Sequence, residues 1–133
     1  MKKILVVHNN YRHLGGEDIA VQNEINYLKK YYEVETLFFS NNIKSLIKDS
    51  ISLIKSNNSK SNLKIELLVK KFKPDVVYIH NTWFKVSLGI FKILNELGIK
   101  TVVKLHNFRY YCTKSYLSKD HFGSKTFCDA CGA

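Results

Sequence analysis

Three His-Asn dipeptides are the residues of this chain whose types and spacing best fit a reaction site. They are His8-Asn9, His80-Asn81 and His106-Asn107, and each directly follows a short apolar run. Imidazole and carboxamide groups both donate and accept hydrogen bonds, so together they suit a ligand rich in hydroxyl groups. A single histidine at such a position more often forms a core hydrogen bond or a cap. Three at equivalent positions favour a binding site.

A glycine pair ends the polar turn after the first apolar run. Gly15-Gly16 closes this turn, and a helical pattern starts at Glu17. Free N–H groups and the dipole at a helix N-terminus attract anions, and glycine lets a ligand approach the backbone closely. The pair is neither a dinucleotide-binding fingerprint nor a P-loop. Two interpretations stay open: a phosphate contact, or a turn that needs positive φ. In the second, Glu17 only stabilises the helix start.

The cysteines form a second candidate site. Cys128-x-x-Cys131 has metal-ligand spacing, and Cys112 precedes it. Three thiols are one ligand short of a tetrahedral structural zinc site, and His121 or His106 is a candidate for the fourth. The other interpretation is a set of free, partly buried thiols. Disulfides are not expected, because we expect a cytoplasmic chain.

The elements that must position these groups alternate along the chain. Apolar and alternating runs predict strands over residues 4–7, 33–39, 75–80 and 101–106, and helical spacing predicts helices over residues 17–30, 43–54, 63–72 and 86–97. Residues 56–62 form a predicted surface loop, and Gly98 stands where a helix ends. The pattern indicates an α/β fold, a Rossmann-like, doubly wound parallel sheet. Carboxyl ends of parallel strands share one edge, so the His-Asn dipeptides and the glycine turn should line one crevice.

Length and composition set the remaining expectations. A chain of 133 residues with 45% hydrophobic content predicts one domain, 1–133, with an irregular segment over 109–133 that leaves it incomplete at its C-terminus. The net charge of +10 is spread along the chain, so nucleic acid is an unlikely partner. No apolar run approaches a membrane span, and no signal peptide begins the chain. Lysines beside the apolar stripe of the helix at 43–54 suggest peripheral contact with the inner face of the membrane. The alternative is that this stripe packs on the sheet.

Four segments in order resemble one protein family. They are KILVVHNNYRHLGGED, KPDVVYIHNTW, VVKLHNFRYYC and CDAC, between residues 3 and 131. Together they resemble the N-terminal, acceptor-side domain of family 4 retaining glycosyltransferases, which have the GT-B architecture of two Rossmann-like domains. The resemblance implies transfer of a sugar from a nucleotide diphosphate sugar to a hydroxyl of a glycan or lipid-linked acceptor, with retention of configuration and no required metal or other cofactor.

The resemblance also implies roles for residues. Gly15 and Gly16 would face the donor diphosphate, and His106 would lie beside the donor sugar as the catalytic candidate. Glu17, His80 and Asn81 match positions assigned to substrate binding on the acceptor side, and Asn107 follows His106 at the same strand exit.

The family's second domain, which binds the nucleotide, has no counterpart in this sequence. We therefore expect a truncated chain that supplies one half of the cleft, is inactive alone, and needs a donor-binding domain in cis or in trans. The alternative function is a non-catalytic Rossmann or flavodoxin-like ligand-binding module. A receiver domain is disfavoured, because it needs acidic residues where His8-Asn9-Asn10 follows the first strand.

Overall fold

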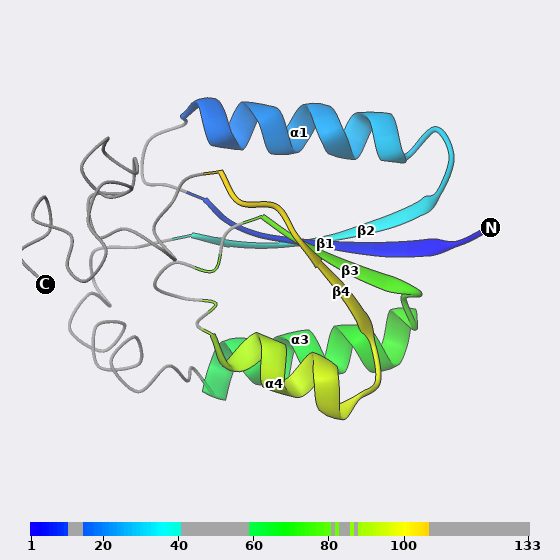
Figure 1. Cartoon of the computed structure of the whole chain (residues 1–133), viewed down its shortest axis with the longest axis vertical. Helices are drawn as coiled ribbons and strands as arrows, with labels where there is room; N and C mark the ends of the chain where they lie inside the picture. Colours follow the sequence, from blue (N-terminus) through cyan, green and yellow to red (C-terminus); the bar gives the residue numbers. More distant parts are fainter. Residues whose placement is uncertain (11–14, 41–58, 81, 83–85, 87, 107–133) are drawn as a thin grey trace, which may run out of the picture.

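Strands and helices alternate through the part of the chain that the structure describes. The computed structural model describes residues 1–10, 15–40, 59–80, 82, 86 and 88–106. The elements are β1 (Lys3–Asn10), α1 (Gly16–Leu28), β2 (Glu33–Ser40), α3 (Ser59–Phe72), β3 (Val76–Ile79), α4 (Gly89–Glu96) and β4 (Lys100–Val103) (Figure 1). The helix expected over 43–54 lies outside the described residues.

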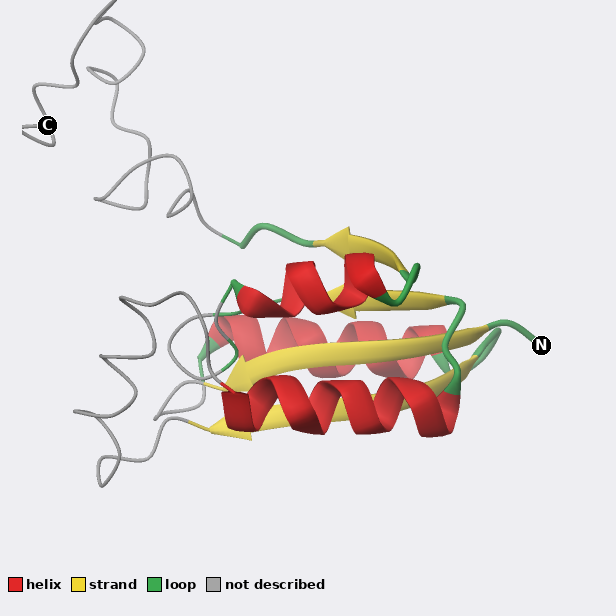
Figure 2. Cartoon of the chain, turned by 90° about the horizontal axis from the view of Figure 1, so that it is seen from below, coloured by secondary structure: helices red, strands yellow, loops and turns green. Residues whose placement is uncertain are grey.

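The strands form one parallel sheet in the order β2-β1-β3-β4. Helix α1 covers one face of this sheet, and α3 and α4 cover the other (Figures 1 and 2). The Rossmann-like α/β expectation is therefore confirmed. The chain moves from β1 outward to β2 and then returns past β1 to β3, so the direction of winding changes between β1 and β3. In folds of this kind ligands bind at that switch point, outside the carboxyl ends of the strands.

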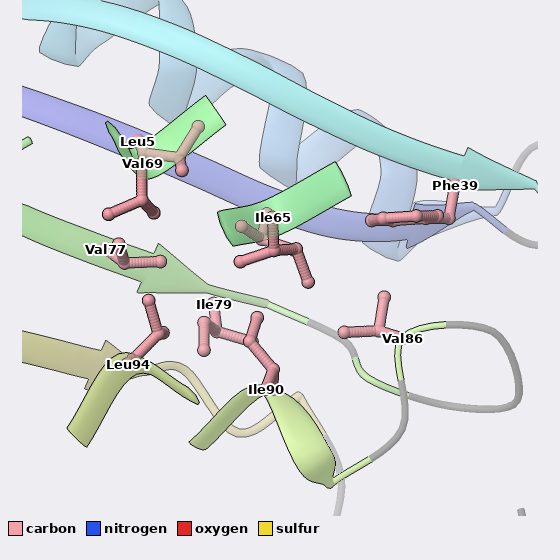
Figure 3. Close-up of a cluster of buried hydrophobic side chains, with 10 residues drawn as sticks. Leu5, Phe39, Ile65, Val69, Val77, Ile79, Val86, Ile90 and Leu94 are labelled. Atoms are coloured by element: carbon pink, nitrogen blue, oxygen red, sulfur yellow. The ribbon is translucent and has the colours of Figure 1, made fainter. Parts of the chain in front are cut away.

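The main hydrophobic core lies between the sheet and the α3–α4 layer. The sheet contributes alternate residues of β1 and β3, and the two helices contribute residues three or four positions apart, as the periods of strand and helix require. The side chains are Leu5, Val7, Val77, Ile79, Ile65, Val69, Ile90 and Leu94, joined by Phe39 and Val86 (Figure 3). Burying each aliphatic side chain of this size stabilises the fold by roughly 1.5–3 kcal/mol.

The opposite face of the sheet has a smaller apolar cluster. It consists of Val6 with Val21 and Ile25 of α1. Ile19 of the same helix is 58% exposed and does not belong to the buried stripe. Four partly buried side chains, Ile4, Leu28, Val34 and Tyr78, pack against this cluster.

Helix α3 begins earlier than its apolar pattern suggests. The predicted loop at 56–62 is wrong for residues 59–62, which form the first turn of α3. Ser61 is buried one turn before Ile65, so it continues the core-facing stripe with a small polar side chain. Packing on the sheet here outweighs the low helix propensity of serine and asparagine.

Backbone angles and hydrogen bonds define where α3, α4 and β4 end, and so where the chain enters or leaves the sheet. Lys73 follows α3 with φ 54°, and its N–H donates to the Val69 carbonyl at 2.8 Å. Gly98 follows α4 with φ 66°, which confirms its predicted place. Strand β4 ends at Val103, before the predicted end at residue 106, although Lys104 N–H still donates to the Ile79 carbonyl at 2.9 Å. His106 thus lies just beyond the sheet edge.

Candidate functional site

Two of the three predicted histidines lie side by side at the carboxyl edge of the sheet. Val7 pairs with Ile79 in register, and His80 N–H donates to the Val7 carbonyl at 3.0 Å. Because Val7 and Ile79 face the core, the next residues, His8 and His80, face α1. Their rings pack edge to face with centroids 6.1 Å apart, and their exposed fractions are 1% and 4%.

The third histidine joins this pair. His80 Nδ1 and His106 Nε2 lie 3.0 Å apart, within hydrogen-bond distance, and the ring centroids are 5.2 Å apart. His106 is half-buried. The expectation that separate strand exits bring His8, His80 and His106 to one place is confirmed.

Glu24 of α1 connects the histidines to the rest of this face. Its Oε2 accepts a hydrogen bond from Tyr78 Oη at 2.9 Å, its Oε1 forms a close ion pair with Lys104 Nζ, and Oε2 lies 3.7 Å from His80 Nε2. We did not anticipate Glu24 or Lys104 from the sequence. Lys104 stands two residues after Val102, which pairs with Tyr78 in the sheet, and this period of two is the signal that could have found it.

The surroundings of His80 favour one tautomer of the histidine pair. Glu24 Oε2 lies 3.7 Å from His80 Nε2, beyond hydrogen-bond distance, and the negative carboxylate favours the tautomer that has its proton on Nε2. His80 Nδ1 then accepts from Nε2–H of His106. His106 Nδ1 is left with a lone pair that can accept a hydrogen bond from a ligand hydroxyl.

Burial keeps both histidines neutral at pH 7. Burial is the largest cause of the lowered pKa of His80, and the neighbouring His106 and His8 act in the same direction, so that this pKa is about 4. Burial also lowers the pKa of His106; Glu17 acts against this, while Lys104 and His8 add to it. Burial raises the pKa of the Tyr78 hydroxyl, which therefore stays protonated and donates to Glu24. Neutral imidazoles with one donor and one acceptor suit hydroxyl groups.

Asp18 forms hydrogen bonds that connect β1 with the start of α1. His8 Nε2–H donates to Asp18 Oδ1 at 2.9 Å, and Gly15 N–H donates to Asp18 Oδ2 at 2.9 Å. Asp18 is buried and occupies the third helical position. We expected the neighbouring Glu17 to be the functional acid; the spacing of an acid three residues after a helix cap could have indicated Asp18.

Within the described residues, His8 Nδ1 and His80 Nε2 are buried without a hydrogen-bond partner.

The glycine turn is not explained by backbone strain. Gly15 is extended, with φ −115° and ψ 174°, and among the described glycines only Gly98 has positive φ. The interpretation that this pair serves a positive-φ turn is therefore wrong. A Cβ placed on Gly16 would meet no atom within 4 Å. Space for a close ligand thus exists, but Asp18 already accepts one N–H of this turn, so an anion would meet a partly neutralised helix terminus.

Two cavities flank α1 beside these groups. One, of about 280 Å³, is bordered by His8, Asn10, Asp18 and Phe38 among others. The other, of about 360 Å³, is bordered by Asn23, Glu24, Tyr27, Leu28 and Tyr78. The polar contacts of His8 and Glu24 therefore border open space on either side of the helix.

The remaining predicted site residues are Asn81, Asn107, Cys112, Cys128 and Cys131, all outside the described residues. The zinc site therefore stays a prediction. Among the described side chains, no group of three or more histidines, cysteines or acids is close enough to hold a metal ion. None of the described helices is long and apolar enough to cross a membrane.

Comparison of the chain with protein-family models, with curated proteins and with solved structures finds no match in any of the three.

Proposed function

We propose that this chain supplies the acceptor-side wall of a sugar-transfer site, at which a sugar moves from a nucleotide diphosphate sugar to a hydroxyl of a glycan or lipid-linked acceptor. The observation that carries the proposal is the contact between His80 and His106 at 3.0 Å, at the switch point of the parallel sheet. The sequence resemblance assigns the donor sugar to the same histidine, His106.

The charge state of the histidine cluster supports a hydroxyl-bearing ligand there. His80 and His106 have lowered pKa values and are neutral at pH 7. The nearby cation, Lys104, is paired with Glu24. Hydrogen-bond donors and acceptors without strong net charge match the hydroxyls of a sugar ring better than they match a phosphate. His106 Nδ1 is the acceptor assigned to that ring.

The start of α1 is the proposed diphosphate contact. The N–H groups of the first helical turn have no partner within the helix, and the positive end of the dipole adds to their attraction for anions. Gly16 leaves open space in front of them. Since Asp18 and Glu17 lie in the same turn, we expect this contact to be weak by itself and to need cationic groups from an opposite, donor-binding domain in cis or in trans.

Titration of the chain with nucleotide diphosphate sugars, followed by amide and imidazole NMR signals, tests this proposal. Weak binding is expected, with dissociation constants of roughly 1 mM. The Gly15 and Gly16 amides and the His106 ring should shift with the nucleotide sugar, whereas a free pyranoside should shift His106 alone.

Two results would contradict the proposal. One is the absence of any shift at these groups in a folded sample. The other is turnover of the donor by residues 1–133 alone, because the proposal assigns nucleotide binding to a different domain. Binding without turnover even after a donor-binding domain is added would favour a non-catalytic ligand-binding module.

A further inference from the structure

The outer face of α3 carries leucines where a solvent-facing helix normally carries polar residues. Leu63 and Leu67 are 56% and 59% exposed. At 3.6 residues per turn they form one stripe, on the side opposite the buried Ile65 and Val69. The core therefore uses one apolar stripe of α3 and leaves a second one uncovered.

Lysines surround this second stripe. Lys60, Lys64 and Lys71 are exposed and lie along one flank of it, and Lys70 lies along the other. The one acid of α3, Glu66, pairs with Lys70 at 2.5 Å. Among the described residues, no acidic side chain forms an ion pair with Lys60, Lys64 or Lys71. The outer face of α3, defined here as Leu63 and Leu67 with these three lysines, thus combines an apolar centre with uncompensated positive charge.

We propose that the outer face of α3 binds the surface of an anionic lipid bilayer. Helices of this composition lie in the plane of the interface, with leucines at the acyl boundary and lysine stems reaching the headgroups. Charge complementarity selects anionic lipid: each lysine near such a surface contributes about 1 kcal/mol. A nucleic-acid surface would instead place cations, arginine or aromatic rings at its centre. The inference depends on neither the proposed function nor the segment at 43–54, where the sequence suggested a membrane contact.

The layer order makes this contact compatible with the fold. Helices α3 and α4 form the outer layer on one face of the sheet, and α1 covers the other (Figures 1 and 2). His8 and His80 lie on the α1 face, because the preceding residues, Val7 and Ile79, face the core. A bilayer against α3 would therefore leave the histidine cluster uncovered. Leu63 and Leu67 make no contribution to the buried core, so they can be replaced without opening a cavity.

Co-sedimentation with vesicles of phosphatidylcholine alone and of phosphatidylcholine with phosphatidylglycerol tests the proposal. The chain should bind the anionic vesicles at low salt and only weakly bind the neutral ones. The variant Lys60→Gln/Lys64→Gln/Lys71→Gln should bind about a hundredfold more weakly. The variant Leu63→Gln/Leu67→Gln should lose at least about tenfold.

Matched controls place the same chemical changes elsewhere. Lys2→Gln/Lys29→Gln/Lys30→Gln removes three exposed lysines, and Ile19→Gln/Val102→Gln removes two exposed apolar side chains from the α1 face. Both control variants should bind as the parent does. Circular dichroism checks that each variant is folded, and Leu63→Gln alone replaces the double variant if the latter does not fold.

Three results would overturn the proposal. The first is equal binding to neutral and anionic vesicles. The second is parental binding by the leucine variant. The third is tighter binding to an oligonucleotide in the same buffer that depends on the three lysines and not on the leucines, which would identify a nucleic-acid surface.

Discussion

The two faces of the sheet carry side chains of opposite character, although the same strands supply both. Val7 and Ile79 are fully buried in the core under α3 and α4, and the next residues along the chain, His8 and His80, are buried under α1. A strand directs neighbouring side chains to opposite faces, so the candidate site lies one residue away from the core. Precise placement of the histidines is a consequence of how tightly their apolar neighbours pack.

The two faces of the sheet also differ in the interactions that stabilise their buried side chains. The α3–α4 face is stabilised mainly by apolar burial, with few buried polar residues such as Ser61 and Asn9. On the α1 face, polar groups need partners, because an unpaired buried donor or acceptor is costly. The His8–Asp18, His80–His106 and Glu24–Tyr78 contacts provide most of them. We therefore expect changes on the first face to alter stability and changes at the exposed end of the second to alter binding.

The largest expected effect is the difference in stability loss between a core substitution and a substitution in the histidine cluster. Ile79→Ala should lower the free energy of unfolding by about 3 kcal/mol, since it leaves a cavity in the core. His106→Ala, at a half-buried position, should lower it by no more than about 1 kcal/mol. Urea denaturation measures both. Equal losses would mean that His106 is a structural residue and that the division between the two faces is wrong.

Asp18 should be the exception, a polar residue of the α1 face on which stability depends. Its carboxylate accepts hydrogen bonds from both His8 and Gly15. In Asp18→Asn one of these two acceptors becomes a donor, so we expect a loss of about 2 kcal/mol. Glu17→Gln, at the adjacent position, is the matched control and should stay within about 0.5 kcal/mol. Identical thermal unfolding of the two variants would contradict this assignment.

The pH dependence of stability should report on His80. Its pKa falls from 6.5 to about 4 on folding, mainly through burial. The unfolded chain therefore binds this proton more readily, and stability should decrease as pH falls through the window from 6.5 to about 4. The full linkage value is about 3 kcal/mol, and solvent screening of this ring at the sheet edge reduces the expected decrease to about 1–2 kcal/mol. The groups that face this ring are His8, His106, Tyr78 and Glu24, and Lys104 is paired with Glu24.

His80→Gln should flatten the profile in that window, and His106→Gln should flatten it less. Urea midpoints measured at several pH values provide the comparison. A profile of the His80 variant that is parallel to that of the parent would show that another group causes the dependence.

The smallest expected difference in stability is between alanine substitutions at two glycines, Gly98 and Gly16. Gly98 has φ 66°, so Gly98→Ala should cost about 1 kcal/mol through a strained left-handed conformation. Gly16 has open space at the Cβ position and no positive φ, so Gly16→Ala should be neutral or stabilising by a few tenths of a kcal/mol. Melting temperatures of both variants test this. A clear destabilisation by Gly16→Ala would mean that the fold itself requires this glycine.

The sequence predicted the parts of the fold that depend on periodicity. The four apolar runs gave the parallel strands and the shared edge at which His8, His80 and His106 meet, because strand order and direction bring their ends together. It could not predict the start of α3, where Ser61 is buried by tertiary packing although its segment is polar. Lys73 at φ 54° likewise has a conformation that lysine does not favour.

The candidate site was predicted less completely than the fold. Glu17 and Asp18 are adjacent acids, and only the helix geometry shows that the second one points at His8. Glu24 and Lys104 are distant in the chain, and their ion pair depends on how α1 lies over β3 and β4. Contacts of this kind depend on how whole helices and strands pack together, and a local pattern of residues does not predict that packing.

The most direct test of the central claim is the binding of a nucleotide diphosphate sugar to Gly16→Ala. We predict that this variant keeps the stability of the parent and loses the NMR shifts that the nucleotide sugar causes at the Gly15 amide, while a free pyranoside still shifts the His106 ring. Unchanged binding of the nucleotide sugar by a stable Gly16→Ala variant would contradict the claim that the start of α1 and the histidine cluster form one sugar-transfer site.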